Sequence, residues 1–549
     1  MRAPVAWIIL RLAFAAAALP AWSQVPKLDF LFPAGGRAGS RFGLTVSGGL
    51  KEGDRLQASH PGISFWRPNA KEWEVSIAAD TPAGLHWVFA SNAQGASTAK
   101  LFAVDLWNEL SEVEPNDSVA QAQALPKTAG LINGGLQRAG DVDHFALELA
   151  AGQELALSLD AYGLGSAVDA LLHVIGPDGQ RQHTASDSRN LDPATRFKAK
   201  ASGRHVIEVA GFPHPPAADV RFTGGSSLVY RLKVAAGKAV WAAHPAAVAL
   251  DGKTQVRWLG LGQDSKPQSL KASQILGHGR LRRLIAADGL WPVEVLSSAK
   301  TVQMEREPND DPAKAQTMEL GVMGALLDRA GDVDVFALSL KKGDNLRASV
   351  FGKRLGLAAD FSLSVEGPDG KALGSADDLG EQNSDPVLQF TATADGVHRI
   401  RVNEVMRRLP VLGNAYALEV IKPEAEVELT LASAAPVMLE PGKSQTLKMT
   451  AKRPAGIKGG LKLRVAGLPR GVAAPEVSIP EKDGDFSLVL QAAANAPAGG
   501  GPVVLEAWSL EAPITAVPAK FLFRADNQRG LSAVDEIDLV WVGVLPPAK

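Results

Sequence analysis

Two groups of acidic and amide residues recur in this sequence with the same spacing and in the same order. The residues of the first group are Glu112, Glu114, Asn116, Asp117, Asp141 and Asp143. Those of the second are Glu305, Glu307, Asn309, Asp310, Asp332 and Asp334. Carboxylate and amide oxygens are the ligands that calcium prefers, and a calcium ion takes about six to eight of them. Each group therefore predicts a calcium site.

The local spacing of each group favours convergence of its side chains. In an extended segment residues i and i+2 point to the same side, so Glu112 and Glu114 form one pair and Asp141 and Asp143 another. Five carboxylates gathered at about 4–6 Å repel one another unless a cation lies between them. Asp143 also shares the parity of the apolar Phe145, and a carboxylate on a core-facing position needs a partner.

A structural role is the alternative interpretation of the same residues. Pro-Asn-Asp forms turns and caps helices without a metal, and the Gly-Asp pairs suit hairpins. Turn chemistry does not require the two preceding glutamates, and we therefore favour the metal.

The two acidic groups belong to a longer internal repeat. Gly152 and Gly343 lie 191 positions apart, as do the turns at 176–179 and 367–370, both Gly-Pro-Asp-Gly. Each copy ends in an alternating run that starts at a tyrosine, Tyr230 or Tyr416, at a core-like position. A repeat of roughly 120 residues indicates duplication of a module.

Strand patterns dominate the remainder of the chain. Short runs with period-two alternation, such as 73–77 and 335–340, are separated by Gly, Pro and Asp at about ten-residue intervals. Helical periodicity is weak, and only 117–125 and its counterpart 310–318 are expected to form short helices, the first capped by Asp117. The predicted fold class is all-β, a tandem array of β-sandwich domains.

The length of 549 residues allows four or five domains. The expected segments are a signal peptide (1–23), a β-domain (24–106), the first acidic module (107–235), a shortened copy of the first β-domain (236–302), the second acidic module (303–422) and a last β-domain (423–549). Residues 1–23 combine Arg2, an apolar stretch and small residues before a cleavage site, which predicts export to the periplasm, cell surface or medium. An uncleaved N-terminal anchor is the alternative, and no later segment is long and apolar enough for a membrane span.

The acidic modules resemble the bacterial pre-peptidase C-terminal domain. The resemblance rests on Glu-x-Glu-Pro-Asn-Asp, on Gly-Asp-x-Asp-x-Phe and on the Gly-Pro-Asp-Gly hairpin, all present in both copies. It implies a β-sandwich in which the acidic segment and the later aspartate pair supply calcium ligands. The segments 24–106, 236–302 and 423–549 resemble, more weakly, the immunoglobulin-like domains that accompany such modules.

Composition and motifs limit the classes of function. The net charge of −2 gives no field to attract nucleic acid, and the absence of cysteine removes thiolate chemistry and disulfides. The sequence has no nucleophile motif, zinc-peptidase motif or P-loop. We therefore expect a secreted, monomeric, non-catalytic scaffold or adhesion protein that binds an envelope or extracellular polymer or protein. The alternative is an accessory, polymer-binding component of an exported peptidase or glycoside-degrading system.

Overall fold

The computed structural model describes residues 25–545 except for several internal segments. These are residues 70–71, 93–94, 127–129, 189–190, 214–221, 238, 263–265, 272–273, 277–279, 287–291, 379–384, 408–413, 424–426, 432–436, 454–458, 512–515, 518, 524–534 and 537–539. The predicted signal peptide, residues 1–23, lies outside the described residues.

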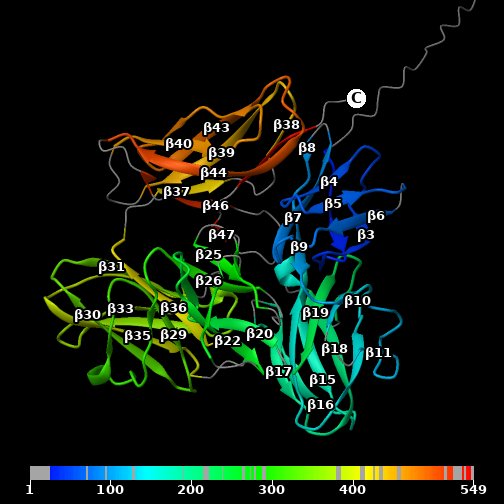
Figure 1. The fold of residues 1–549 in the computed structure, drawn as a ribbon, viewed down its shortest axis with the longest axis horizontal. Coiled ribbons are helices and arrows are strands. Elements are labelled where there is room, and N and C mark those ends of the chain that lie inside the picture. The colour runs from blue at the N-terminus through cyan, green and yellow to red at the C-terminus, as the bar shows by residue number, and fades with distance from the viewer. Residues whose placement is uncertain are drawn as a thin grey trace, which may run out of the picture.

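The chain folds into β-sheets arranged as successive sandwiches, and the all-β prediction is confirmed (Figure 1). The chain is divided into consecutive stretches, and each stretch supplies the strands of two sheets. Alternating apolar residues explain the layers, because one face of every strand must be buried against the facing sheet.

The N-terminal sandwich contains a four-stranded and a five-stranded sheet. The strands of the first, in spatial order, are β1 (Phe30–Phe32), β3 (Arg41–Ser47), β6 (Trp73–Ile77) and β5 (Ile63–Trp66). Those of the second are β2 (Gly35–Arg37), β9 (Lys100–Asp105), β7 (Gly84–Asn92) and β4 (Arg55–Ala58), with β8 (Gly95–Ala96) beside β7.

The first acidic module, residues 107–235 by prediction, has two five-stranded sheets. One contains β10 (Glu109–Ser111), β12 (Gly130–Gly135), β19 (Val229–Ala236), β14 (Glu154–Asp160) and β17 (Ala194–Lys198). The other contains β11 (Gln123–Ala124), β13 (Asp143–Leu149), β18 (Gly203–Pro213), β15 (Val168–Ile175) and β16 (Arg181–Ala185). A short 3₁₀ helix, η1 (Tyr162–Leu164), follows β14.

The second acidic module repeats this topology strand for strand. Its first sheet contains β27 (Gln303–Met304), β29 (Gly321–Leu326), β36 (Ala415–Ile421), β31 (Asn345–Phe351) and β34 (Val387–Thr391). Its second contains β28 (Gln316–Thr317), β30 (Val333–Leu340), β35 (Gly396–Glu404), β32 (Phe361–Glu366) and β33 (Ala372–Ala376). Two 3₁₀ helices, η3 (Pro312–Lys314) and η4 (Lys353–Leu355), complete it.

Two further pairs of sheets separate and follow the acidic modules. The intervening segment forms β20 (Ala239–His244), β22 (Gln255–Leu261) and β23 (Gln268–Ser269), facing β21 (Ala247–Ala249), β26 (Val293–Ser298), β25 (Leu281–Leu284) and β24 (Ile275–Leu276). The C-terminal sandwich has one sheet of β41 (Val472–Ala473), β43 (Gly484–Ala492), β39 (Ser444–Lys452), β37 (Val427–Leu431), β46 (Ala519–Phe523) and β47 (Asp535–Glu536). Its other sheet contains β38 (Val437–Leu439), β48 (Val540–Val544), β44 (Gly499–Ser509), β40 (Leu461–Ala466) and β42 (Val477–Ile479), with β45 (Ala516–Val517) beside β44.

The core of each acidic module lies between its two sheets. In the first module Leu157 and Tyr230 of one sheet pack with Phe145 and Ile207 of the other. Tyr230 and its counterpart Tyr416 are both buried, which confirms the core positions expected for them.

The expected helices at 117–125 and 310–318 are wrong. Residues 118–121 form only a turn before β11, and the second copy has one turn of 3₁₀ helix capped by Asp311. The reason is that Gln123–Ala124 and Gln316–Thr317 pair in parallel with β13 and β30. These edge pairings leave too few residues for a stable α-helix.

A buried ion network joins the N-terminal sandwich to the first acidic module. Arg231 on β19 is fully buried, and its guanidinium contacts Asp105 of β9 at 2.9 Å and Glu109 at 2.8 Å. Lys233, also buried, contacts Asp105 at 3.1 Å and Asp160 at 3.0 Å. The cations of one domain thus neutralise a carboxylate of its neighbour.

The equivalent junction of the second module combines apolar packing with an ion pair, between Arg280 of the intervening segment and Glu419 of β36 at 2.7 Å. Ala417 occupies the position of Arg231 and belongs to a cluster with Ala246 and Ala247 of the intervening segment. Pro245 lies so close to Gly324 that a Cβ atom there would be 2.1 Å from it. Small residues therefore stand where the first junction has Arg231, while Glu419, at the position of Lys233, pairs with Arg280.

No helix among the described residues is long and apolar enough to cross a membrane.

Replacing Arg231 by methionine should destabilise the first acidic module and the N-terminal sandwich together. The substitution leaves Glu109 without its cation and Asp105 with only Lys233. Removal of one partner from a buried ion pair costs about 3–5 kcal/mol. The measurement is urea unfolding of the full chain, with hydrogen exchange at β9 and β19 to locate the effect.

The matched control is Arg196→Met, since Arg196 lies in the same module and forms an exposed pair with Glu154 at 2.7 Å. That pair should contribute no more than about 1 kcal/mol. Equal effects of the two substitutions would show that the buried network does not stabilise the junction.

Candidate functional site

The first acidic group lies where the chain crosses twice between the sheets of its module. Residues 112–122 connect β10 of one sheet to β11 of the other, and residues 136–142 connect β12 to β13. Because β10 runs parallel to β12 and β11 parallel to β13, both crossings lie at the same end of the sandwich. This topology brings together side chains that are almost thirty positions apart.

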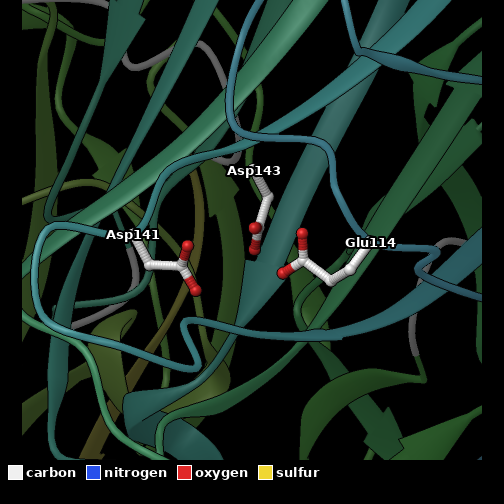
Figure 2. Close-up of side chains that lie close together, drawn as sticks. All are labelled: Glu114, Asp141 and Asp143. Carbon is white, nitrogen blue, oxygen red and sulfur yellow. The ribbon is translucent and has the colours of Figure 1, made fainter.

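Three carboxylates converge between these crossings. Glu114, Asp141 and Asp143 each place one oxygen within 4.8 Å of the others, and their carboxylates point toward a common centre (Figure 2). Asp141 and Asp143 are fully buried, and Glu114 is half-buried. Their spacing is suited to one cation between them.

Several oxygens of this cluster have no hydrogen-bond partner. Glu114 Oε1, Asp141 Oδ1 and Asp143 Oδ1 are buried without one, and so are both side-chain polar atoms of Asn116. Asn116 lies beside the three carboxylates, since its backbone N–H donates to Glu114 at 3.0 Å. Buried polar atoms are nearly always satisfied in folded proteins, so this concentration of unsatisfied polar atoms marks a group that could hold a metal ion.

The other two predicted carboxylate ligands of the first module have partners of their own, although Glu112 lies close to Asp143, since the Tyr230 hydroxyl contacts both carboxylates, at 3.4 and 2.7 Å. The carboxylate of Glu112 accepts hydrogen bonds from the Gly135 N–H at 3.0 Å and from the Gln137 side chain at 3.0 Å. Asp117 forms an ion pair with Arg138 at 2.5 Å. The structure therefore separates an inner group, Glu114, Asp141 and Asp143, from these flanking carboxylates.

Burial changes the protonation of the inner carboxylates when no metal is present. Burial, together with the nearby charge of Glu112, raises the pKa of Asp143 to about 9. Burial likewise raises the pKa of Glu112 to about 7 and raises the pKa of Asp141. A metal-free site therefore retains protons at neutral pH that a bound cation would displace.

A buried tyrosine fixes the innermost carboxylate in each module. The hydroxyl of Tyr230 donates to Asp143 Oδ2 at 2.7 Å, and that of Tyr416 donates to Asp334 Oδ2 at 2.5 Å. The sequence indicated that both tyrosines are in the core, but it did not reveal these hydrogen bonds. The sequence did contain a signal for these hydrogen bonds, because in each module a tyrosine and an aspartate both occupy core-facing positions.

The second acidic group has the same plan with a different set of closest oxygens. Glu305, Glu307 and Asp334 have oxygens within 4.8 Å of one another, as do Glu307, Asp328 and Asp332. Asn309 is fully buried, donates through its side-chain amide to Glu305 at 2.9 Å and leaves its Oδ1 without a partner. Asp310 instead pairs with Arg329.

Burial also raises the pKa values of the second group. The pKa of Asp334 rises to about 10, with the charge of Glu305 as the next cause after burial. Burial raises the pKa of Glu305 to about 7 and that of Asp332 to about 6. Both modules therefore hold uncharged carboxyl groups where ligands for a cation would be expected.

Three residues near the sites were missed by the sequence analysis. Asp328 adds a carboxylate to the second group, where the first module has Gln137. Arg138 and Arg329 precede the buried Asp141 and Asp332 by three residues and form ion pairs with them. The repeat alignment, in which both arginines occupy equivalent positions, was the signal that could have revealed them.

His144 ties the first site to the outer face of its sheet. One ring nitrogen lies 3.1 Å from the backbone oxygen of Asn116, and the other lies 3.1 Å from Glu208. Glu208 also accepts a hydrogen bond from Arg181 at 2.7 Å. Val335 occupies the equivalent position in the second module, so this connection is particular to the first.

A family model matches part of the second module. The model of the bacterial pre-peptidase C-terminal domain covers residues 332–404. This range starts at Asp332, includes Asp334 and ends with the last residue of β35. The match agrees with the resemblance found in the sequence of this module. No curated protein matches the chain.

Solved structures with similar folds were also found. The pre-peptidase C-terminal domain of a collagenase from Bacillus anthracis is 16% identical, with 21% of this chain and 100% of that chain covered and a TM-score of 0.17. PliG from Aeromonas hydrophila, a periplasmic inhibitor of g-type lysozyme, is 16% identical, with 24% and 97% covered and a TM-score of 0.15. ZmpB from Clostridium perfringens, a catalytic domain with two carbohydrate-binding modules, is 12% identical, with 70% and 45% covered and a TM-score of 0.14.

Residues 332–404 are thus similar to the bacterial pre-peptidase C-terminal domain in sequence.

Proposed function

We propose that this chain is an exported, non-catalytic binding protein of the bacterial envelope whose two acidic modules each bind calcium. The observation that carries the metal assignment is the set of buried carboxylate and amide oxygens without partners, present in both modules. Hard oxygen donors at this spacing fit calcium better than they fit the transition metals, which favour imidazole or thiolate.

The first acidic module is proposed to be a second domain of the pre-peptidase type. Its strand order is the same as that of the second module in both sheets, and its tyrosine–aspartate hydrogen bond is in the equivalent place. The three other sandwiches are proposed to be immunoglobulin-like companions of the two modules.

Export and partner class rest on the sequence. The signal-like residues 1–23 and the absence of cysteine fit an exported bacterial protein that folds without disulfides. The proposed role is scaffolding or adhesion through a polymer or protein of the envelope, performed by a monomer. Calcium would stabilise the crossings at the end of each module, because an ion that binds only the folded state raises its stability.

The first test is the stoichiometry of calcium binding. Calorimetric titration of the full chain should give two calcium ions, with dissociation constants on the order of 10⁻⁴–10⁻³ M or somewhat tighter, as in extracellular modules. Glu114→Gln should remove one ion and Glu307→Gln the other, since each glutamate belongs to a separate cluster. The double variant should bind none.

Differential scanning calorimetry in chelator and in calcium supports the titration. At about 100-fold excess over the dissociation constant, each occupied site should gain about 2.7 kcal/mol of stability. Arg196→Gln, remote from both clusters, is the control and should keep both ions. If the unaltered chain gives neither heat nor a melting shift at millimolar calcium, the acidic segments are turns and caps, and the metal assignment is wrong.

The second test is the dependence of stability on pH. In the metal-free chain the folded Asp143 retains its proton up to a pKa of about 9, whereas the unfolded chain releases it near 3.8. The unfolded state thus binds fewer protons between these values, and the free energy of unfolding should fall as pH rises through this window. Asp334, with a pKa of about 10, should act in the same direction.

Calcium should reverse this trend, because the ion displaces the protons and its affinity therefore rises with pH. Melting temperatures at pH 5, 7 and 9, in chelator and in calcium, measure both effects. Asp143→Asn together with Asp334→Asn should reduce the pH dependence, most of all between pH 7 and pH 9, and should abolish the response to calcium. An unaltered chain whose metal-free melting temperature rises steadily from pH 5 to pH 9 would contradict the assignment of buried, protonated carboxyls.

The third test concerns catalysis. Neither acidic cluster is arranged beside a nucleophile–base pair in the described part of the chain, and we expect no peptidase, esterase or glycosidase turnover above background. Broad substrate panels with the purified chain, with and without calcium, provide the measurement. Turnover that a single substitution abolishes would overturn the non-catalytic assignment.

A further inference from the structure

An arginine supplied by the chain itself lies against the outer part of each acidic cluster. Arg138, in the crossing from β12 to β13, contacts Asp117 at 2.5 Å and Asp141 at 3.5 Å. Arg329, in the equivalent crossing, pairs with Asp310, contacts Asp332 at 3.2 Å and contacts Asp328 at 2.9 Å. The two arginines occupy equivalent positions in the repeat.

These contacts divide each site into two halves with different charge balance. In the first module the outer half, Asp117 and Asp141, faces a guanidinium. Within the described residues the inner half, Glu114 and Asp143, forms no ion pair with a lysine or arginine, and it contains buried oxygens without hydrogen-bond partners. Asp141 belongs to both halves, since it also lies within 4.8 Å of the inner carboxylates.

The outer half is the part of the site that the arginine reaches. The Arg138 guanidinium lies 2.5 Å from Asp117 and 3.5 Å from Asp141, and it therefore occupies the side of the cluster from which an entering cation would contact these two aspartates.

The arginine side chains are free to leave the site without being buried elsewhere. The exposed fraction of the side chain is 60% for Arg138 and 49% for Arg329. Because each guanidinium is largely exposed, a divalent ion can displace it into water and then balance the charge of the buried aspartate in its place. A guanidinium that remained in place would repel the ion across the shared aspartate.

We propose that Arg138 and Arg329 are internal counter-ions that set the calcium affinity of their sites, holding the outer aspartates when no metal is bound and competing with the ion for them. This inference rests on the proposed calcium function. It assigns to each arginine two opposite effects, stabilisation of the metal-free module and weakening of calcium binding. An arginine with a purely structural role would produce only the first.

The two sites should differ in how strongly the arginine stabilises the metal-free module and weakens calcium binding. Arg329 faces three carboxylates, whereas Arg138 faces two, because Gln137 stands where the second module has Asp328. Removing Arg329 therefore leaves more uncompensated charge than removing Arg138. The second module should show both effects more strongly.

The experiment is calcium titration of the full chain with one site silenced. In a Glu307→Gln background only the first site remains, and Arg138→Gln should tighten calcium binding by about three- to tenfold. The same substitution should lower the melting temperature in chelator, and calcium should restore it. In a Glu114→Gln background Arg329→Gln should do the same for the second site, with a larger change in affinity.

Two further variants make the result specific. Arg138→Lys keeps the charge but holds the aspartates less firmly, so its affinity should lie between those of the unaltered and glutamine chains. Arg196→Gln removes an exposed arginine on β17, at the opposite edge of the sheet from β10, and should leave the affinity unchanged. Should the glutamine variant fail to fold, the lysine variant carries the test.

The failures of the two proposals can be told apart. If the chain that retains Arg138 and Arg329 takes up no calcium, the proposed function fails and this inference fails with it. If that chain binds calcium and the Arg138 variants bind it equally or more weakly, only the inference is overturned. Tighter binding together with lower metal-free stability supports it.

Discussion

The cost of burying carboxylates at the end of a sandwich governs the architecture of both acidic modules. Asp143 and Asp334 occupy core-facing positions at the start of a central strand, where an ionised carboxylate without a partner is strongly disfavoured. The fold meets this cost in three ways: a tyrosine hydroxyl bonded to each aspartate, protons retained in the metal-free state, and a second strand crossing that brings further oxygens to the same place. The parallel pairings of β10 with β12 and of β11 with β13 follow from the need to hold both crossings together.

The two modules show how one scaffold accommodates different neighbours. Strand β19 presents Arg231 and Lys233 to the N-terminal sandwich, whereas β36 presents Ala417 and Glu419 at the same positions. The first junction therefore has a buried network of matched charges, whereas the second combines close packing of small residues with the Arg280–Glu419 ion pair. In both copies the crossings that build the acidic sites belong to the module itself.

The sequence revealed the features that depend on local spacing. Period-two alternation gave the strands, and the parity of Asp143 with Phe145 correctly placed that aspartate in the core. The predicted helix at 117–125 failed because a pairing with β13, remote in the sequence, outweighs a weak local preference. Glu112 illustrates the same limit, since its alternation with Glu114 is visible in the sequence, whereas the hydrogen bond from Gly135 of another strand to its carboxylate is not. The ion-pair partners of Arg231 and Arg138 depend on which strands and crossings become neighbours, and a single sequence does not specify these neighbours.

The first and last sandwiches of the chain touch. Phe89 and Ala99 of the N-terminal sandwich form a small apolar cluster with Met438 and Leu545 of the C-terminal one, and strands β8 and β38 lie side by side (Figure 1). The array of domains is consequently bent, so that its first and last sandwiches are neighbours. A tension applied to the two ends would load this apolar contact before it reached the ion network or the acidic crossings. We expect its rupture to separate the first and last sandwiches while each of them stays folded, because the cluster lies outside the main core of either one.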